Sequence, residues 1–245
     1  MNKITIVVLV IIVLFVFYYY YTKISLTNSI ISINNLNTPI PTTRLQNNGN
    51  SDNETYSVWV YLNSAPTDKT KSNTIISRGQ GGYFDFCLYL NYNTNGIRLY
   101  TYFKTNSVLS SDNIKITDSF PVQQWTQITI VKKQKQYIDC YLNGKLVISY
   151  YYNNKINSST NNINIGKTYS DTDNTSPAYL NASITGESIT DAYISNINYW
   201  SNVLNPADIY NNYLVGISNG ILSSNYNLNV SLLNNNVEAK AYSLF

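Results

Sequence analysis

The sequence predicts an all-β domain, and its composition and its short hydrophobic runs are the observations that predict it. The 245 residues include 24 Tyr and 7 Phe but only 7 Ala and 3 Glu, a poor mixture for helices and a good one for strands. Hydrophobic residues make up 44% of the chain, which is enough for a core. Short β-rich runs separated by turn residues favour a sandwich or a barrel.

Eight of these runs are predicted strands, and several alternate with a period of two. Phe84, Phe86 and Leu88 fall on one face of their run, and Cys87 falls on the other. Asn143-Gly144 lies between two runs and predicts a hairpin, because both central positions of the turn need a positive φ. The predicted strands are residues 56–62, 83–90, 97–103, 125–131, 137–142, 146–152, 163–165 and 192–199.

One short helix is predicted after the last of these strands. Asn205 is a favourable N-cap, Pro206 fits the first helical position, and Asp208 favours the positive end of the helix dipole. Gly216 can end the helix in the left-handed conformation.

A transmembrane helix is predicted at the N-terminus. The 18 residues from Ile4 to Tyr21 carry no charge, and a helix of that length spans about 27 Å, close to the hydrocarbon core of a bilayer. The four tyrosines at positions 18–21 would form an aromatic belt before Lys23. A cleavable signal peptide is the alternative, although no Ala precedes Ala65 to form a small-residue cleavage site.

The anchor predicts a single-pass membrane protein whose first partner is the lipid bilayer. Lys3 and the amino terminus lie before the apolar run, so the positive-inside rule favours a body outside the cytosol, at a cell surface, a host membrane or a virion. The predicted organisation is a transmembrane anchor (1–22), a stalk or linker (23–53), a β-sandwich (54–217) and a tail or added strand (218–245).

The stalk is predicted from the Asn, Thr, Ser and Pro residues before position 54, with Pro39, Pro41 and Gly49 among them. The alternative is that the apolar residues within 24–33 supply a first strand.

Composition excludes several classes of function. The chain has no His, so it cannot build a Ser-His-Asp triad or an imidazole zinc site. Its net charge of +3 with 3 Arg is too small for a nucleic-acid footprint, so no nucleic-acid partner is predicted. Cys87 and Cys140 fall on faces of different polarity, which argues against a disulfide between them.

Six groups of motifs follow one another along residues 54–216, and in this order they resemble the laminin-G-like jelly-roll domain of the concanavalin A-like lectin/glucanase superfamily. They are Ser57-Val58-Trp59-Val60, Ile75-Ile76-Ser77-Arg78-Gly79, Trp125-Thr126-Gln127-Ile128, Tyr141-Leu142-Asn143-Gly144-Lys145, Ile163-Asn164-Ile165-Gly166, and Ala192-Tyr193-Ile194-Ser195 with Leu204-Asn205-Pro206. The resemblance implies a two-sheet antiparallel jelly-roll sandwich with one concave sheet. The chain departs from the family pattern at Thr126-Gln127, where a His is usual, and in its long loop after Gly166.

Glycan hydrolysis is not predicted, although glucanases share this fold. Both classes of glycosidase need two facing carboxyl groups. Glu54, Glu187 and Glu238 are isolated in the sequence, and Asp171 and Asp173 are a close pair but lie in a loop. The chain is therefore predicted not to be an enzyme.

The long loop before the last strand is the predicted calcium site. Asp171, Asp173, Asn174 and Asp191 supply hard oxygen ligands of the kind that Ca²⁺ prefers, and the resemblance implies one Ca²⁺ near a rim loop. The alternative is a solvated polar loop whose Asp and Asn side chains cap its own turns.

Two tyrosines and two lysines are the predicted ligand-binding residues. Tyr150 and Tyr152 share a face and could stack on sugar rings, with core or cross-strand packing as the alternative. Lys132 and Lys133 lie in a basic turn that could contact an anionic glycan, with edge protection as the alternative. Together these features predict a membrane-anchored recognition module for a glycan or a protein surface. The alternative function is a structural membrane or viral envelope protein.

Overall fold

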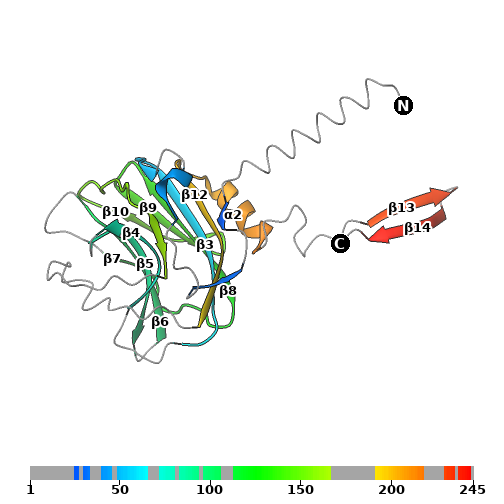
Figure 1. The fold of residues 1–245 in the computed structure, drawn as a ribbon, viewed down its shortest axis with the longest axis horizontal. Helices are drawn as coiled ribbons and strands as arrows, with labels where there is room; N and C mark the ends of the chain where they lie inside the picture. Colours follow the sequence, from blue (N-terminus) through cyan, green and yellow to red (C-terminus); the bar gives the residue numbers. More distant parts are fainter. Residues whose placement is uncertain are drawn as a thin grey trace, which may run out of the picture. The chain divides into compact units, whose positions relative to one another are not determined.

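Two antiparallel sheets form the larger of two units in the computed structural model (Figure 1). This unit is Ile24–Ile217, and the other unit comprises Met1–Lys23 and Ser218–Phe245. The structure describes residues 25–27, 30–33, 40–45, 49–65, 72–80, 83–93, 96–105, 113–166, 191–217, 229–234 and 237–243. The predicted all-β sandwich with one short helix is confirmed.

The first sheet has seven strands. Its order is β1-β12-β3-β8-β9-β10, with β2 also paired to β12. The strands are β1 (Ser25–Thr27), β2 (Ile31–Ser32), β3 (Glu54–Leu62), β8 (Trp125–Lys133), β9 (Tyr137–Leu142), β10 (Lys145–Tyr151) and β12 (Ala192–Trp200).

The second sheet has five strands in the order β11-β4-β5-β6-β7. They are β4 (Ser72–Gln80), β5 (Tyr83–Asn93), β6 (Gly96–Phe103), β7 (Asn113–Thr117) and β11 (Ile163–Ile165). The list of predicted strands contained neither β4 nor β7. The polar, glycine-containing end of β4 resembles a turn in composition, and Lys115 interrupts the short apolar pattern of β7.

Alternate side chains of the strands form the core. Val58 and Val60 of β3 belong to one buried cluster with Phe86 and Leu88 of β5, so the two sheets are joined through these faces. Cys140 lies in the same cluster.

A second buried cluster contains Phe84, Cys87, Tyr89 and Tyr102. Cys87 alternates with the core residues of β5 and so lies on the opposite face of the five-stranded sheet. Both cysteines are free, in agreement with the prediction from strand alternation. Burial raises the pKa of Cys87 from 9.0 to about 12.

The predicted Asn-Gly hairpin joins β9 to β10. Asn143 has φ 50° and Gly144 has φ 72°, so both turn residues are left-handed. A Cβ on Gly144 would lie 3.0 Å from the Tyr210 ring and 3.1 Å from Tyr213. The glycine is therefore needed for its backbone conformation and for the close approach of the following helix.

The predicted helix is confirmed as α2 (Pro206–Val215). The Asn205 side chain accepts a hydrogen bond from the Asp208 backbone N–H at 2.8 Å, and Gly216 has φ 79°. Ile209 is buried with Val131 and Tyr141, so the helix packs against β8 and β9 of the seven-stranded sheet.

The structure places the described residues of the predicted stalk in the sandwich. β1 and β2 both pair with β12, and Ile33, Ile40 and Leu45 are buried in the core. The alternative of a strand within residues 24–33 matches this arrangement. The apolar side chains of this segment explain why it joins the sandwich. Their burial in the core stabilises the folded domain, whereas an exposed linker would leave them in water.

The predicted anchor from Ile4 to Tyr21 lies outside the described residues. Within the part of the chain that the structure describes, no helix has the length and apolar character needed to cross a bilayer. In the C-terminal segment, β13 (Asn229–Asn234) and β14 (Val237–Ser243) pair with each other as an antiparallel hairpin. The predicted alternatives for residues 218–245, a free tail or a strand added to the sandwich, stay predictions.

Candidate functional site

The two predicted ligand-binding lysines point to opposite sides of their strand. β8 continues to Lys133, two residues beyond the predicted end, so Lys132 and Lys133 alternate instead of sharing a turn. Lys132 is 1% exposed, with its Nζ 2.7 Å from Glu54 Oε2. Lys133 is partly exposed and forms an ion pair with Asp139. Only Lys133 is therefore accessible to a ligand.

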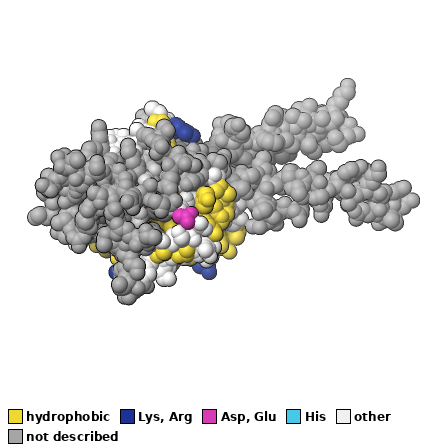
Figure 2. Space-filling view, turned by 60° about the horizontal axis from the view of Figure 1, so that its bottom comes forward, with side chains coloured by type: hydrophobic (Ala, Val, Ile, Leu, Met, Phe, Trp, Pro, Cys, Tyr) yellow, Lys and Arg dark blue, Asp and Glu magenta, His cyan; other side chains and the backbone are white. Residues whose placement is uncertain are grey.

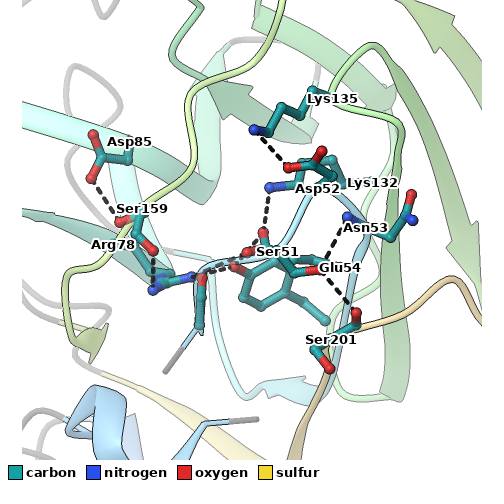
Figure 3. Close-up of polar contacts among 12 residues, drawn as sticks. Ser51, Asp52, Asn53, Glu54, Arg78, Asp85, Lys132, Lys135, Ser159 and Ser201 are labelled. Carbon is teal, nitrogen blue, oxygen red and sulfur yellow. Dashed lines mark hydrogen bonds and ion pairs between the residues drawn. The ribbon is translucent and has the colours of Figure 1, made fainter. Parts of the chain in front are cut away.

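Glu54 is the centre of a buried charged network (Figure 3). Its carboxylate faces Lys132 on one side and Arg78 Nη1, 3.6 Å away, on the other. Tyr56 donates a hydrogen bond to Glu54 at 3.1 Å and accepts one from Arg78 at 2.9 Å. Tyr199 also donates to Glu54, at 3.3 Å.

Burial shifts the pKa of two members of this network, Lys132 and Tyr56. Burial lowers the pKa of Lys132 below its ordinary value of 10.5, against the opposing effect of Glu54. Burial, reinforced by Glu54, raises the pKa of Tyr56 well above 10.0. Since the carboxylate of Glu54 is enclosed by cations and phenols, it is not presented to a substrate.

Arg78 also joins loops that are distant in the sequence. Its guanidinium donates to the carbonyl oxygens of Gly49, Ser159 and Asn161, at 3.1, 2.7 and 3.0 Å. Asp85 accepts hydrogen bonds from the Ser159 and Asn161 side chains, both at 2.7 Å. These contacts connect the segment before β3 with the segment before β11.

The predicted tyrosine pair lies on the core side of its strand. Tyr152 is 1% exposed, and Tyr150 packs against the core, with 5.0 Å between the two ring centroids. The packing alternative therefore describes both residues. Tyr151, on the opposite side, is 48% exposed and contacts Tyr137 at 4.9 Å between centroids.

Three of the four predicted calcium ligands, Asp171, Asp173 and Asn174, lie outside the described residues. Asp191 is described, and neutral groups donate to both of its oxygens. Asn63 Nδ2 lies 3.0 and 2.9 Å from them, and Ser64 Oγ lies 3.0 Å from one. Among the residues with a described placement, no group of three His, Cys, Asp or Glu could hold a metal ion.

Three aromatic side chains form a row beside Asp191, which we call the aromatic row. Tyr193 of β12 pairs in register with Tyr61 of β3, and Tyr61 pairs with Trp125 of β8. Ring centroids are 6.4 Å apart for Tyr61 and Tyr193 and 5.4 Å apart for Tyr61 and Trp125. Tyr193 is 41% exposed, and the other two are partly exposed.

Strand alternation places the row on the outer face of the seven-stranded sheet. Val60 and Leu62 of β3 belong to the core, so Tyr61 between them points away from it. Trp59, two residues earlier on the same outer face, stacks on Tyr213 of α2 at 5.7 Å between centroids. The helix thus covers the neighbouring part of this face, while the row stays accessible to solvent.

The Asp191 carboxylate lies where β3 ends and β12 begins, two residues before Tyr193 of the aromatic row. The Asn63 backbone N–H donates to the Asp191 backbone oxygen at 2.9 Å, which holds the residue after β3 against the residue before β12. Figure 2 shows that hydrophobic side chains of the described residues gather on one face of the molecule. Aromatic rings can stack on the apolar face of a sugar, and a carboxylate can accept hydrogen bonds from its hydroxyl groups.

Sequence reasoning did not single out the aromatic row. Tyr61, Trp125 and Tyr193 all lie in predicted strands, and Tyr61 alternates with core residues, which is a signal for an outward aromatic residue. Their meeting depends on the pairing of β12 with β3 and of β3 with β8. Such long-range register cannot be read from local periodicity.

A family model described as the concanavalin A-like lectin/glucanases superfamily, of the laminin G type, matches residues 36–210. No curated protein sequence matches the chain. Solved structures with similar folds include the receptor-binding domain of botulinum neurotoxin type G, at 20% identity and a TM-score of 0.45, covering 67% of this chain and 38% of that one.

Two further similar structures are neurotoxin domains. The receptor-binding domain of botulinum neurotoxin D matches at 16% identity and a TM-score of 0.48, covering 66% of this chain and 37% of that one. The binding domain of botulinum neurotoxin DC, in complex with SialylT, matches at 16% identity and a TM-score of 0.46, covering 66% and 35%. This chain thus spans little more than a third of each neurotoxin domain. Its own family model covers well over half of it, and the chain belongs to the concanavalin A-like lectin/glucanase superfamily.

Proposed function

We propose that this protein is a non-enzymatic recognition module that binds carbohydrate at the aromatic row. The observation that carries this proposal is the alignment of Tyr193, Tyr61 and Trp125 across three adjacent strands, with Asp191 two residues before Tyr193. A sugar offers both an apolar ring face and hydroxyl donors, and this surface offers a partner for each.

A recognition role is also supported by the environment of Glu54. Glycosidases need one carboxyl group to donate a proton and a second one to act as nucleophile or base. Glu54 is buried and ion-paired with Lys132, and it accepts hydrogen bonds from two tyrosines. It is therefore enclosed by its partners and held away from solvent, where a substrate does not reach it.

The proposal includes attachment to a membrane through the uncharged residues from Ile4 to Tyr21, with the sandwich outside the cytosol. A calcium ion held by Asp171, Asp173, Asn174 and Asp191 stays a prediction from their oxygen ligands. The aromatic row does not depend on this ion, because its three residues are placed by strand pairing.

A glycan array probed with the full chain tests the proposal. We expect binding by the wild type, and at least a tenfold loss with Trp125→Ala or Tyr193→Ala, because a stacked aromatic residue is removed. Tyr151→Ala is the matched control, since Tyr151 is 48% exposed against 41% for Tyr193 and lies outside the row. Failure to bind any glycan, or equal losses with the control variant, would contradict the proposed function.

A further inference from the structure

We infer that the ligand of the aromatic row is an uncharged oligosaccharide, and that Asp191 discriminates against acidic ones. This inference rests on the proposed carbohydrate-binding function and specifies its ligand class. It follows from the charge of Asp191, two residues before Tyr193, and from the spacing of the three rings.

The negative charge of Asp191 has no cationic neighbour in the described structure. Its hydrogen-bond donors are the Asn63 amide and the Ser64 hydroxyl, both neutral. No described Lys or Arg forms an ion pair with it. Three other described carboxylates do form ion pairs: Asp52 with Lys135, Asp118 with Lys115 and Asp139 with Lys133. Asp208 resembles Asp191 in having a neutral partner, the Asn205 amide. Among the residues that the structure describes, no cation therefore compensates the charge of Asp191.

This charge favours sugar hydroxyl groups and disfavours sugar acids. A hydroxyl that donates to an ionised carboxylate forms a charge-assisted hydrogen bond. A carboxylate or sulfate on the ligand would instead place a second negative charge near Asp191. At a separation of about 6 Å in water, the repulsion weakens binding about threefold, and more strongly where solvent is excluded.

The geometry of the row favours a chain of sugars over a single one. Its three rings lie on three neighbouring strands, with centroid spacings of 6.4 and 5.4 Å. One sugar ring can cover one aromatic side chain, so successive rings of an oligosaccharide can contact successive members of the row. The ring planes are inclined by 56° and 50° to each other, which suits a twisted chain better than a flat one.

The test uses the full chain and pairs of oligosaccharides that differ only in a terminal sialic acid or sulfate. Affinities are measured at low ionic strength for the wild type, Asp191→Asn and Asp52→Asn. Asp191→Asn keeps an acceptor for Asn63 and Ser64 while removing the charge. Asp52 is the matched control, because it is an exposed carboxylate at the other end of β3. Asp52 precedes that strand, whereas Asp191 contacts Asn63, the residue that follows the strand.

We expect the wild type and Asp52→Asn to bind the neutral member of each pair at least threefold more tightly. The preference should weaken as salt is added, because screening reduces the repulsion. It should disappear in Asp191→Asn at every salt concentration. Neutral trisaccharides should also bind more tightly than the corresponding monosaccharides.

The outcomes separate this inference from the proposed function. If acidic and neutral glycans bind the wild type equally well, or if Asp191→Asn keeps the preference, the inference is wrong while carbohydrate binding stands. If monosaccharides bind as tightly as trisaccharides, the proposed oligosaccharide chain length is wrong. If no glycan binds at all, the proposed function fails, and the inference fails with it.

Discussion

Single residues show how the core accommodates charge. Glu54, Arg78 and Lys132 are buried together, with one carboxylate facing two cations. Withdrawing charges from water is costly, and their mutual attraction compensates only when each one has partners. Hydrogen bonds from Tyr56 and Tyr199 to Glu54 supply part of that compensation.

Removing the negative charge of this network should destabilise the fold strongly. Glu54→Gln would leave Lys132 and Arg78 buried without their counter-ion, and we expect the free energy of unfolding to fall by about 3–5 kcal/mol. Urea denaturation followed by tryptophan fluorescence measures the change.

Asp52→Asn is the control for this experiment, because Asp52 forms an exposed ion pair with Lys135. Its effect on the free energy of unfolding should be small, as is usual for surface pairs. Equal stability of the Glu54→Gln variant and the wild type would show that the buried charges do not depend on each other.

At the scale of strands and helices, the correct predictions came from the alternation of side chains along strands and from residues that favour turns and helix ends. The Asn143-Gly144 turn and the ends of α2 carry local signals, and the structure confirms both. Alternation along the strand also predicted that Tyr151 lies on the face opposite to Tyr150 and Tyr152. It could not show which of the two faces is buried in the core. That depends on which face of β10 meets the opposite sheet, a property of tertiary packing.

The N-cap of α2 provides an element-scale test. Asn205→Ala removes the hydrogen bond to the Asp208 N–H and should lower the free energy of unfolding by about 1 kcal/mol. Asn205→Ser, which keeps an N-cap acceptor, should restore most of the loss. Equal stability of the Ala and Ser variants in thermal unfolding would mean that this cap does not stabilise the helix.

The whole molecule shows why the domain boundary was misplaced. Composition made residues 23–53 look like a stalk, because Asn, Thr, Ser and Pro are common there. The structure instead adds β1 and β2 to the seven-stranded sheet and buries Ile33, Ile40 and Leu45. A few apolar residues are enough to hold a polar segment against the domain when their side chains can be buried in its core.

Truncation tests this boundary. A fragment of residues 24–217 should fold cooperatively, whereas 54–217 should lose about 2 kcal/mol for each of the three buried side chains removed and also lose the strands paired with β12. Circular dichroism during urea denaturation compares them. A cooperative transition of 54–217 at the midpoint of the longer fragment would support the stalk interpretation.

The fold was therefore more predictable than the site. Local periodicity located most strands, and the order of motifs identified the family that the match over residues 36–210 confirms. The aromatic row needed the register of β12, β3 and β8, which brings Tyr193, Tyr61 and Trp125 together from distant parts of the chain. No local sequence pattern predicts that these three side chains lie side by side.

The central claim is that a sugar contacts the aromatic row, and tryptophan fluorescence tests it most directly. The chain has three Trp, and only Trp125 lies in the row. Titration with the glycan that binds best should change the emission of the wild type and of Trp59→Phe. Trp125→Phe should keep measurable binding but lose that change. A signal that persists in Trp125→Phe would contradict the claim and place the sugar elsewhere.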